Sequence, residues 1–334
     1  MNQELKILIV RQDRLGDLMM TLPTINFLRK VFPKAEIDLS CQEMFRELLK
    51  GFCLEHRVGL VTSCRKTYDA ALFLNGTWKD CWELVAHKIS IRVGMYSKPW
   101  SFFLLNHGVR QKRSRIPKNE AEFNLDLAQI LALILGVREK PDNERTLLPM
   151  DQTSRARAHQ KLTELGLGDL TRFVVFHPGM RGSALNVPAE SYWQLIDLWE
   201  NRGFKVLISI GPEARDQELK RKLLDRRPEL PMVSGLNLPE LGELFRMAEV
   251  VIAPSTGPLH LAHWVGAKTM GLFSPVRAQH PVRWAPWGGK IEAQVLIPEV
   301  DCPAKKDCIG PSCQFYNCME RADWKSLLLR AENG

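Results

Sequence analysis

Short runs of branched apolar residues alternate with longer amphipathic stretches along this chain, and this alternation constrains the fold more than any other feature. In the first half, runs rich in Ile, Leu and Val at 6–10, 36–40 and 70–74 have the length and composition of buried strands. Helical periodicity over 17–31 separates the first two runs. Strands that alternate with helices pair into a parallel sheet. The sequence therefore predicts an α/β fold.

The same alternation restarts after a polar, proline-containing segment at 141–155. The predicted strands and helices of the second half lie at 173–176, 190–199, 205–210, 214–224, 238–247, 250–253, 257–265 and 269–273. A chain of 334 residues suits two domains of about 150 residues each. We predict two doubly wound Rossmann-like domains, 1–150 and 151–318, facing each other across a cleft and followed by a terminal segment, 319–334. Ligands in such sheets bind at the carboxyl ends of the strands.

The composition excludes several classes of protein. The residues are 45% hydrophobic and 25% charged, as in soluble globular proteins. No apolar run approaches the ~20 residues that span a bilayer, and the N-terminus lacks a secretory signal pattern, so we expect a cytoplasmic protein. Lys and Arg outnumber Asp and Glu by 46 − 38 = 8, which favours a nucleotide, a phosphorylated glycolipid or a membrane face as partner, or simply a basic enzyme. No aromatic-rich RNA-binding signature accompanies the charge, so we predict no nucleic-acid partner.

Residues 11–17 form a polar loop between the first predicted strand and a helix. Gly16 allows a tight turn of the backbone. Asp17 has two interpretations of equal weight when it is considered alone. It is either only the N-cap of the helix or a carboxylate at the mouth of the cleft that takes a proton from an acceptor hydroxyl.

Two loops of the second half are rich in small residues and backbone amides. Residues 177–183 follow a strand and suit an anion, although they do not form a Walker motif. Residues 254–260 join a strand to a helix, where Ser255 or Thr256 can cap and the amides of the first turn can hold a diphosphate. An ordinary capped helix is the alternative, but two such loops together favour phosphate binding. Glu213, between these loops, is either a ribose ligand or a solvated acid.

The stretch 100–118 combines aromatic and basic residues. It contains Trp100, Phe102, Phe103, Arg110, Lys112, Arg113, Arg115 and Lys118. It is either a core helix followed by a solvated loop or an amphipathic element that meets a membrane and its anionic head groups.

Four of the eight cysteines cluster near the C-terminus, at Cys302, Cys308, Cys313 and Cys318. Their C-x5-C, C-x4-C and C-x4-C spacings differ from the paired C-x2-C of zinc sites. In a reducing cytoplasm we expect free thiols, with zinc or a disulfide as alternatives.

Together these motifs resemble the ADP-heptose:lipopolysaccharide heptosyltransferase family, glycosyltransferase family 9. The combination of Gly16 and Asp17 with a later Thr-Gly-x-x-His loop, in this order, is specific. The matching segments are 6–11, 15–18, 21–23, 32–37, 68–69, 177–179, 211–213, 255–262 and the cysteine-rich tail that ends at Cys318 and Met319.

The resemblance implies a GT-B fold in which the N-terminal domain binds the acceptor and the C-terminal domain binds the nucleotide sugar. Residues 324–329 would pack back across the first domain. It also implies an inverting transfer of a heptose or related sugar to the lipopolysaccharide inner core, without metal or cofactor. The absence of any Asp-x-Asp pair, which metal-dependent single-domain sugar transferases use, agrees with this. Asp17 would deprotonate the acceptor hydroxyl as the nucleoside diphosphate leaves.

The resemblance also assigns binding residues. The amides of 256–259 would hold the diphosphate, Glu213 the ribose, and the backbone at Gly235 and Leu236 the base. The other expected donor residues are His177, Gly179, Arg181, Ser183, Ser255, Thr256, Gly257, Pro258, Leu259 and His260. The expected acceptor residues are Arg14, Gly16, Arg113, Arg115 and Lys118, facing a phosphorylated or Kdo-bearing glycolipid. We expect a monomer in loose contact with the cytoplasmic face of the inner membrane.

Departures from the family pattern leave two alternatives open. Leu185 and Val187 stand where members often carry a lysine and a tryptophan, and losing the lysine removes a phosphate contact of about 1.5–3 kcal/mol unless Arg181 replaces it. Ser255 stands where many members have an aspartate that contacts the donor sugar. The alternatives are a transferase that uses a different nucleotide sugar, and a catalytically weakened nucleotide- or glycolipid-binding protein on the same fold.

Overall fold

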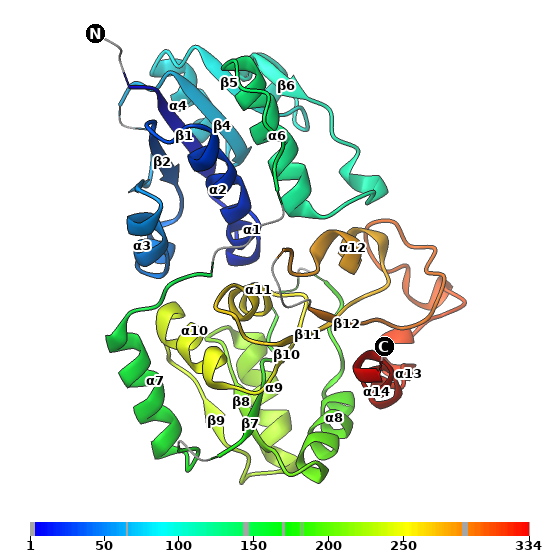
Figure 1. Cartoon of the computed structure of the whole chain (residues 1–334). Coiled ribbons are helices and arrows are strands. Elements are labelled where there is room, and N and C mark those ends of the chain that lie inside the picture. Colours follow the sequence, from blue (N-terminus) through cyan, green and yellow to red (C-terminus); the bar gives the residue numbers. More distant parts are fainter. Residues whose placement is uncertain are drawn as a thin grey trace. The chain divides into compact units, whose positions relative to one another are not determined.

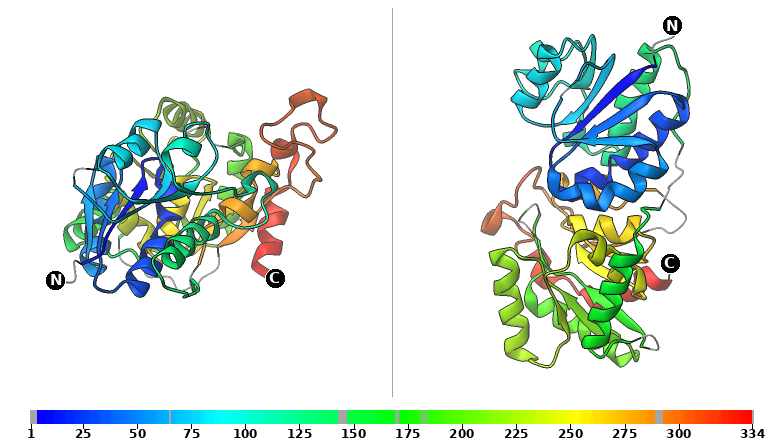
Figure 2. Two further views of the ribbon diagram at one scale, coloured as in Figure 1. Left: turned by 90° about the horizontal axis from the view of Figure 1, so that it is seen from above. Right: turned by 90° about the vertical axis from the view of Figure 1, so that its left-hand side faces the viewer.

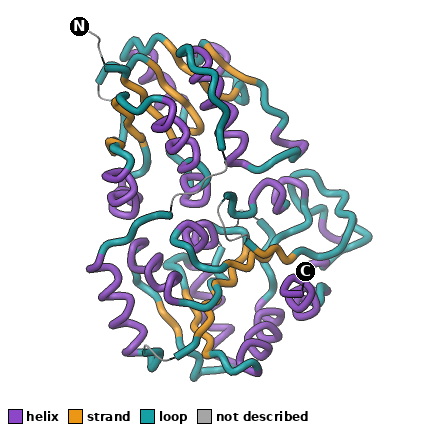
Figure 3. The backbone as a smooth tube through the Cα atoms, viewed as in Figure 1, coloured by secondary structure: helices purple, strands orange, loops and turns teal. Residues whose placement is uncertain are grey.

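The computed structural model describes residues 4–64, 66–142, 147–168, 171–180, 182, 184–288 and 293–333. The chain divides into two compact units (Figure 1). The first comprises residues 1–113 and 118–149, and the second comprises 114–117 and 150–334. In both units the strands lie among surrounding helices (Figures 2 and 3).

The first unit is built on a six-stranded parallel sheet in the order β3-β2-β1-β4-β5-β6. Ile7, Leu8 and Ile9 in the central strand are all fully buried, which shows that both faces of the sheet are covered. The strands are β1 (Lys6–Arg11), β2 (Glu36–Ser40), β3 (Val58–Val61), β4 (Ala70–Asn75), β5 (Ile91–Met95) and β6 (His107–Val109). The helices are α1 (Leu15–Met19), α2 (Leu22–Val31), α3 (Arg46–Glu55), α4 (Trp78–Ala86), α5 (Ser101–Leu104) and α6 (Glu120–Ile134), with the 3₁₀ turn η1 (Glu43–Phe45). The 3₁₀ turn η2 (Arg113–Arg115) spans the boundary of the unit at residue 113.

The second unit repeats the plan with a parallel sheet in the order β12-β11-β10-β7-β8-β9. Its strands are β7 (Phe173–Phe176), β8 (Lys205–Ser209), β9 (Met232–Val233), β10 (Val251–Pro254), β11 (Thr269–Leu272) and β12 (Gln294–Leu296). Its helices are α7 (Gln152–Glu164), α8 (Ala189–Asn201), α9 (Ala214–Arg226), α10 (Leu238–Met247), α11 (Gly257–Trp264), α12 (Pro281–Trp284), α13 (Cys318–Arg321) and α14 (Trp324–Asn333), with 3₁₀ turns η3 (Arg277–Gln279) and η4 (Gly310–Ser312).

Both sheets have the doubly wound strand order, so the prediction of two Rossmann-like units is confirmed. In each unit the order of the strands reverses beside the first strand, between β1 and β4 and between β7 and β10. Open α/β sheets bind ligands at the carboxyl ends of the strands at this switch point. The topology therefore directs attention to the loops that follow these four strands.

The terminal segment differs from the sequence prediction, which placed it on the first unit. In the structure α14 packs on α8 and β12. The side chains of Trp324 and Leu328 are fully buried in the core of the second unit, and Trp324 Nε1 donates to the Met319 carbonyl at 3.0 Å. Apolar side chains at helical spacing here cover the core of their own unit. Within the described ranges, no helix is both long and apolar enough to cross a membrane.

Candidate active site

Three charged side chains contact one another where β1 leads into α1. Arg11, the last residue of β1, pairs through Nε with Asp13 Oδ1 at 2.7 Å and through Nη2 with Asp17 Oδ1 at 2.6 Å. The Arg11 side chain is only 1% exposed, whereas the side chains of Asp13 and Asp17 are 20% and 19% exposed. A buried guanidinium thus fixes two partly exposed carboxylates at the carboxyl end of the central strand.

The neighbouring strands brace this loop. Gln12 Nε2 donates to Ser40 Oγ at 2.7 Å, and Asn75 Nδ2 donates to Asp13 Oδ2 at 2.6 Å. Ser40 ends β2 and Asn75 ends β4, the two neighbours of β1. Gln42 Nε2 adds hydrogen bonds of 2.9 Å to the carbonyls of Gln12 and Asp13. The loop is therefore tied across the switch point of the first unit, as a preorganised site requires.

Asp17 lies in the first turn of α1 and is not the N-cap, which is Arg14. The interpretation of Asp17 as only a helix cap is therefore wrong. Gly16 also lies inside the helix and is not among the glycines with positive φ, so it does not form the tight turn that we predicted. Arg14 is exposed beside them.

Burial raises the pKa of Asp17 from 3.8 to about 6. The charge of Arg11 opposes this effect, whereas Asp13 and Glu120 add to it. At neutral pH the carboxylate is ionised, yet it is a stronger proton acceptor than an ordinary aspartate. A perturbed carboxylate at a switch point is typical of a general base.

Arg113, predicted to face the acceptor, is instead buried. Its Nε donates to Gln111 Oε1 at 2.8 Å, it pairs with the buried Glu120, and its guanidinium carbon lies 5.2 Å from the centre of the Phe123 ring. The ion pair accounts for the difference, because a buried Glu120 needs a cation beside it. Arg113 thus serves the interior of the unit.

The other basic residues of this stretch are closer to the surface. Lys118 forms an ion pair with Asp126, and Arg115 is exposed. Arg14 and Arg115 therefore remain as the solvent-exposed basic residues among the predicted acceptor ligands.

In the second unit the loop after β7 begins at a contact between two buried side chains, His177 and Ser209. His177 Nδ1 lies 3.1 Å from Ser209 Oγ at the end of β8, and burial lowers the pKa of His177 to about 4. The imidazole is therefore neutral at pH 7 and links the ends of two adjacent strands. This places the predicted donor ligand His177 behind the loop, where it supports the loop's conformation.

The carboxylate of Asp216 explains two of the glycines. A Cβ on Gly179 would lie 2.6 Å from Asp216 Oδ1, and a Cβ on Gly211 would also clash with this carboxylate. Asp216 is buried in the first turn of α9. Only glycine lets the loops after β7 and β8 approach it closely.

Arg215 contributes a cation to the same edge of the sheet. A Cβ on Gly182, which has φ +76°, would lie 2.5 Å from Arg215 Nη1. Arg215 is exposed. The guanidinium therefore lies against the loop that we predicted to bind an anion. The predicted ligands Arg181 and Ser183 of this loop lie outside the described residues.

The loop after β10 presents fewer amides than predicted. Thr256 is the N-cap of α11, but its side chain makes no capping hydrogen bond. Pro258 has no N–H, and the Leu259 N–H donates to the Thr256 carbonyl at 3.1 Å. Among the residues from 256 to 259, the amides of Thr256 and Gly257 are left for a ligand, and the half-buried residues 255–258 lie at the surface.

His260 and Leu259 are interior residues of α11. His260 is 3% exposed, and burial, with a smaller effect from His263, lowers its pKa to about 3. Leu259 is fully buried. Their part in the family motif is therefore to anchor the helix whose first turn is exposed.

The predicted ribose and base ligands lie on surface loops of the second unit. Glu213 is the half-buried N-cap of α9. Gly235 is exposed with φ +77°, and Leu236 precedes α10, which begins with a capping box of Asn237 and Glu240.

The two apolar departures from the family pattern serve packing. Val187 is 3% exposed and belongs to the core of the second unit, against which Leu185 packs. The Leu185 N–H donates to Gln279 Oε1 at 2.9 Å. These positions supply no cation for a phosphate.

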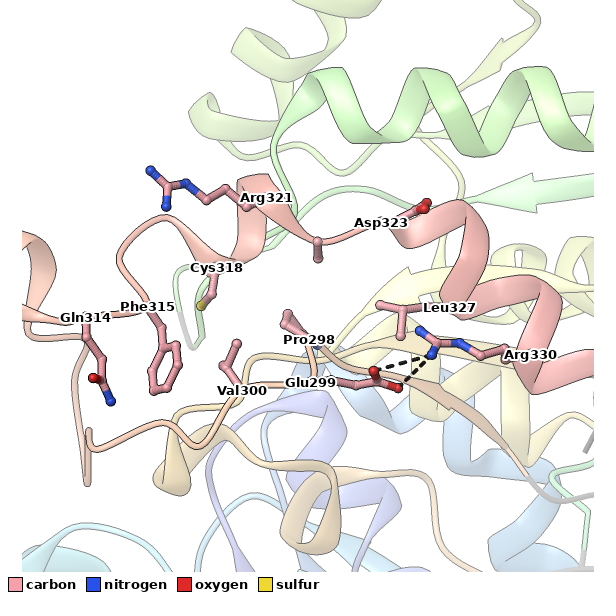
Figure 4. A pocket seen from close by; sticks show the side chains of 11 residues that line it. Pro298, Glu299, Val300, Gln314, Phe315, Cys318, Arg321, Asp323, Leu327 and Arg330 are labelled. Atoms are coloured by element: carbon pink, nitrogen blue, oxygen red, sulfur yellow. Dashed lines mark hydrogen bonds and ion pairs between the residues drawn. The ribbon is translucent and has the colours of Figure 1, made fainter.

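All eight cysteines are free thiols. Burial raises the pKa of Cys318, and Cys302, Cys308 and Cys313 raise it further. In the part of the chain that the structure describes, no group of three or more His, Cys, Asp or Glu side chains is arranged to hold a metal ion. Near Cys318, an open pocket of about 380 Å³ is bordered by Phe315, Arg321 and the ion pair of Glu299 with Arg330 (Figure 4). None of the predicted site residues lines it.

Several site residues were missed by the sequence reasoning. Arg11 holds Asp17, Asp13 and Asn75 hold the loop before it, and Arg215 and Asp216 lie against the loop after β7. Arg11 and Asn75 each end a buried apolar run, and a polar residue at that position is a usable signal. Asp216 gives no such signal, because its contacts with two glycine loops depend on the fold.

Comparison with known proteins identifies the family of this chain. Residues 60–309 match the model of glycosyltransferase family 9 (heptosyltransferase). The chain therefore belongs to glycosyltransferase family 9 and is a glycosyltransferase with the GT-B fold.

Individual relatives extend this result. The chain is 27% identical to a putative glycosyltransferase of Haemophilus influenzae, covering 84% of this chain and 86% of the relative. It is 23% identical to lipopolysaccharide heptosyltransferase 3 of Escherichia coli K12, covering 81% and 82%. The solved structure of E. coli ADP-heptose LPS heptosyltransferase II aligns with a TM-score of 0.70 at 18% identity, covering 98% of this chain and 100% of that one.

Proposed function

We propose that this enzyme transfers a heptose from ADP-heptose to the inner core of lipopolysaccharide, with inversion and without a metal ion. The observation that carries the proposal is Asp17, a partly exposed carboxylate of raised pKa held by the buried Arg11. The family, and relatives named as lipopolysaccharide heptosyltransferases, support the sugar and the acceptor.

Asp17 acts as the general base. Its Oδ1 is bound by Arg11, which leaves Oδ2 to accept the proton of an acceptor hydroxyl. The hydroxyl oxygen then attacks the anomeric carbon, on the face opposite the bond to the diphosphate. That bond breaks, its electrons pass to the diphosphate oxygen, and the configuration inverts. Arg11 keeps the base oriented and limits the rise of its pKa, so that it is ionised at neutral pH.

The leaving diphosphate is held by the second unit. The amides of Thr256 and Gly257 at the start of α11 and the guanidinium of Arg215 are suited to its negative charge. Arg215 then takes the role of the family lysine that Leu185 replaces. Glu213 binds the ribose, and the backbone at Gly235 and Leu236 binds the base.

The acceptor is a phosphorylated or Kdo-bearing glycolipid on the cytoplasmic face of the inner membrane. Arg14, three residues before Asp17, and Arg115 are exposed cations suited to its anionic groups. A basic chain with net charge +8 favours such a partner.

A different nucleotide sugar is the second candidate, because Ser255 replaces the aspartate that contacts the donor sugar in many relatives. Ser255 is half-buried at the end of β10. A thermal-shift screen over nucleoside diphosphates and their sugars separates the two, since a ligand that binds only the folded state raises its stability. Preferential stabilisation by ADP-heptose supports the first candidate, and stabilisation by another sugar nucleotide supports the second.

The base assignment is tested by Asp17→Asn and Asp17→Ala. Both variants should lose turnover while binding the donor as tightly as the native enzyme in calorimetry. Asp13→Asn is the matched comparison, because Asp13 shares the contact with Arg11. Loss of turnover in Asp13→Asn with full turnover in Asp17→Asn would move the base to Asp13. Donor binding without transfer in the native protein would indicate a binding protein.

A further inference from the structure

The exposed aromatic residues of the first unit are concentrated on two neighbouring helices. Trp78 and Trp82 on α4 are 54% and 52% exposed, and Phe102 and Phe103 on α5 are 45% and 84% exposed. Among the described residues, every tryptophan or phenylalanine that is exposed belongs to this set. Helices α4 and α5 contact each other. We call these four residues the α4–α5 surface.

Helix α4 presents its tryptophans from a fixed position. A capping box between Thr77 and Asp80 begins the helix. Cys81 and Leu84 of this helix belong to the hydrophobic core beneath it. Trp78 and Trp82, four residues apart, lie on one side of the helix. The tryptophan rings are exposed to solvent because Cys81 and Leu84 hold the helix against the core.

Helix α5 divides in the same way. Trp100 and Leu104 pack against the core, and Trp100 meets Phe73 edge-on at 5.9 Å. Phe102 stacks on Tyr96 at 4.6 Å, and Phe103 is the most exposed large hydrophobic residue of the described chain. Helix α5 therefore has an inner side packed on the core and an outer side, with Phe102 and Phe103, exposed to solvent.

The charges around these rings are basic. Lys79 lies 6.0 Å from the centre of the Trp78 ring, and Arg110 lies 5.5 Å from that of Phe102. Both are exposed, as is Lys98 before α5. The acids of α4 are engaged internally, because Asp80 caps the helix and Glu83 accepts from the Cys64 N–H at 3.1 Å.

We propose that the α4–α5 surface binds the surface of an anionic lipid bilayer. Large exposed apolar patches mark interaction sites. Tryptophan and phenylalanine enter the interfacial layer of a bilayer, and lysine and arginine beside them pair with anionic head groups. Lys79 and Arg110 lie beside the exposed rings, and Asp80 and Glu83 are occupied as acceptors of backbone N–H groups, so the surface fits this occupant by charge.

Vesicle flotation tests the proposal with the full chain and no sugar nucleotide. The protein should float with vesicles of phosphatidylglycerol and phosphatidylethanolamine, and much less with phosphatidylcholine alone. Phe103→Ser should lower the partition coefficient about tenfold, because burial of one large apolar side chain is lost. Lys79→Glu with Arg110→Glu should lower it about tenfold or more at low salt, and by less at high salt.

Matched controls lie on α3. Leu54 is 72% exposed and Lys50 is also exposed, so Leu54→Ser removes an exposed large apolar side chain and Lys50→Glu reverses one exposed charge elsewhere on the unit. These variants should float like the native protein. Equal losses in both sets, or no binding of the native protein to anionic vesicles, would overturn the proposal. So would sedimentation showing a dimer that Phe103→Ser abolishes, because the surface would then bind a second copy of the chain. The assay contains no donor, so its failure would leave the proposed transfer reaction standing.

Discussion

Replacing Asp17 with asparagine should remove activity and stabilise the first unit at the same time. The pKa of Asp17 is about 6 in the folded protein and 3.8 in the reference state. The folded state therefore binds the proton more tightly, and ionisation at higher pH costs folding free energy. At 1.36 kcal/mol per pH unit, ionisation of Asp17 lowers the free energy of unfolding by at most about 3 kcal/mol above pH 6. Asparagine keeps an oxygen for Arg11 and carries no charge.

The pH dependence gives the sign of the effect. Below pH 3.8 Asp17 is protonated in both states and the variant should match the native protein. The stability advantage of Asp17→Asn should grow as the pH rises to about 6 and stay constant above it. Because the chain has two units, hydrogen exchange of the β1 and β4 amides between pH 5 and pH 8 is the suitable assay. It reports on the first unit alone. A variant that is less stable at pH 8, or an advantage independent of pH, would refute this reasoning.

Three further predictions follow from named contacts. The turnover of the native enzyme should fall below about pH 6 as a single group protonates, because protonated Asp17 cannot accept a proton, and a pH–rate profile that stays flat to pH 5 would contradict this. Arg215→Ala should weaken ADP binding about tenfold to a hundredfold in calorimetry, the effect of one charged contact, whereas Arg221→Ala on the same helix should leave it unchanged. Arg113→Met should destabilise the first unit by about 3–5 kcal/mol in denaturant unfolding, because it removes the cation that forms an ion pair with the buried Glu120. Loss of acceptor affinity with unchanged stability would restore the predicted role of Arg113 as a ligand.

The two sheets were largely predictable because their central strands are continuous apolar runs. Strands β3, β5, β6, β9 and β12 were missed, since each has five residues or fewer, is only partly buried and lacks that signal. The sequence identified Asp17 as a candidate from its position after a strand, but the side chains that contact it could not be predicted. The hydrogen bonds from Gln12 to Ser40 and from Asn75 to Asp13, and the contacts of Asp216, join residues whose proximity depends on the register of parallel strands.

Errors of prediction arose where a side chain had two possible uses. Arg113 was predicted to be a surface cation because it lies in a basic run, but it forms an ion pair with the buried Glu120. Trp324 was predicted to begin a segment that packs across the first unit, but its side chain is buried in the core of the second unit, where α14 contacts α8. In both cases a local partner within the unit decided the outcome.

The most direct test of the central proposal is a transfer assay with purified protein, ADP-heptose and inner-core glycolipid acceptors in the presence of EDTA. Mass spectrometry should show the acceptor gaining a heptose as ADP is released, and NMR should show the inverted anomeric configuration. The Asp17→Asn protein should give neither product while still binding ADP-heptose. Retention of configuration, a requirement for a divalent metal, or full transfer by Asp17→Asn would contradict the account.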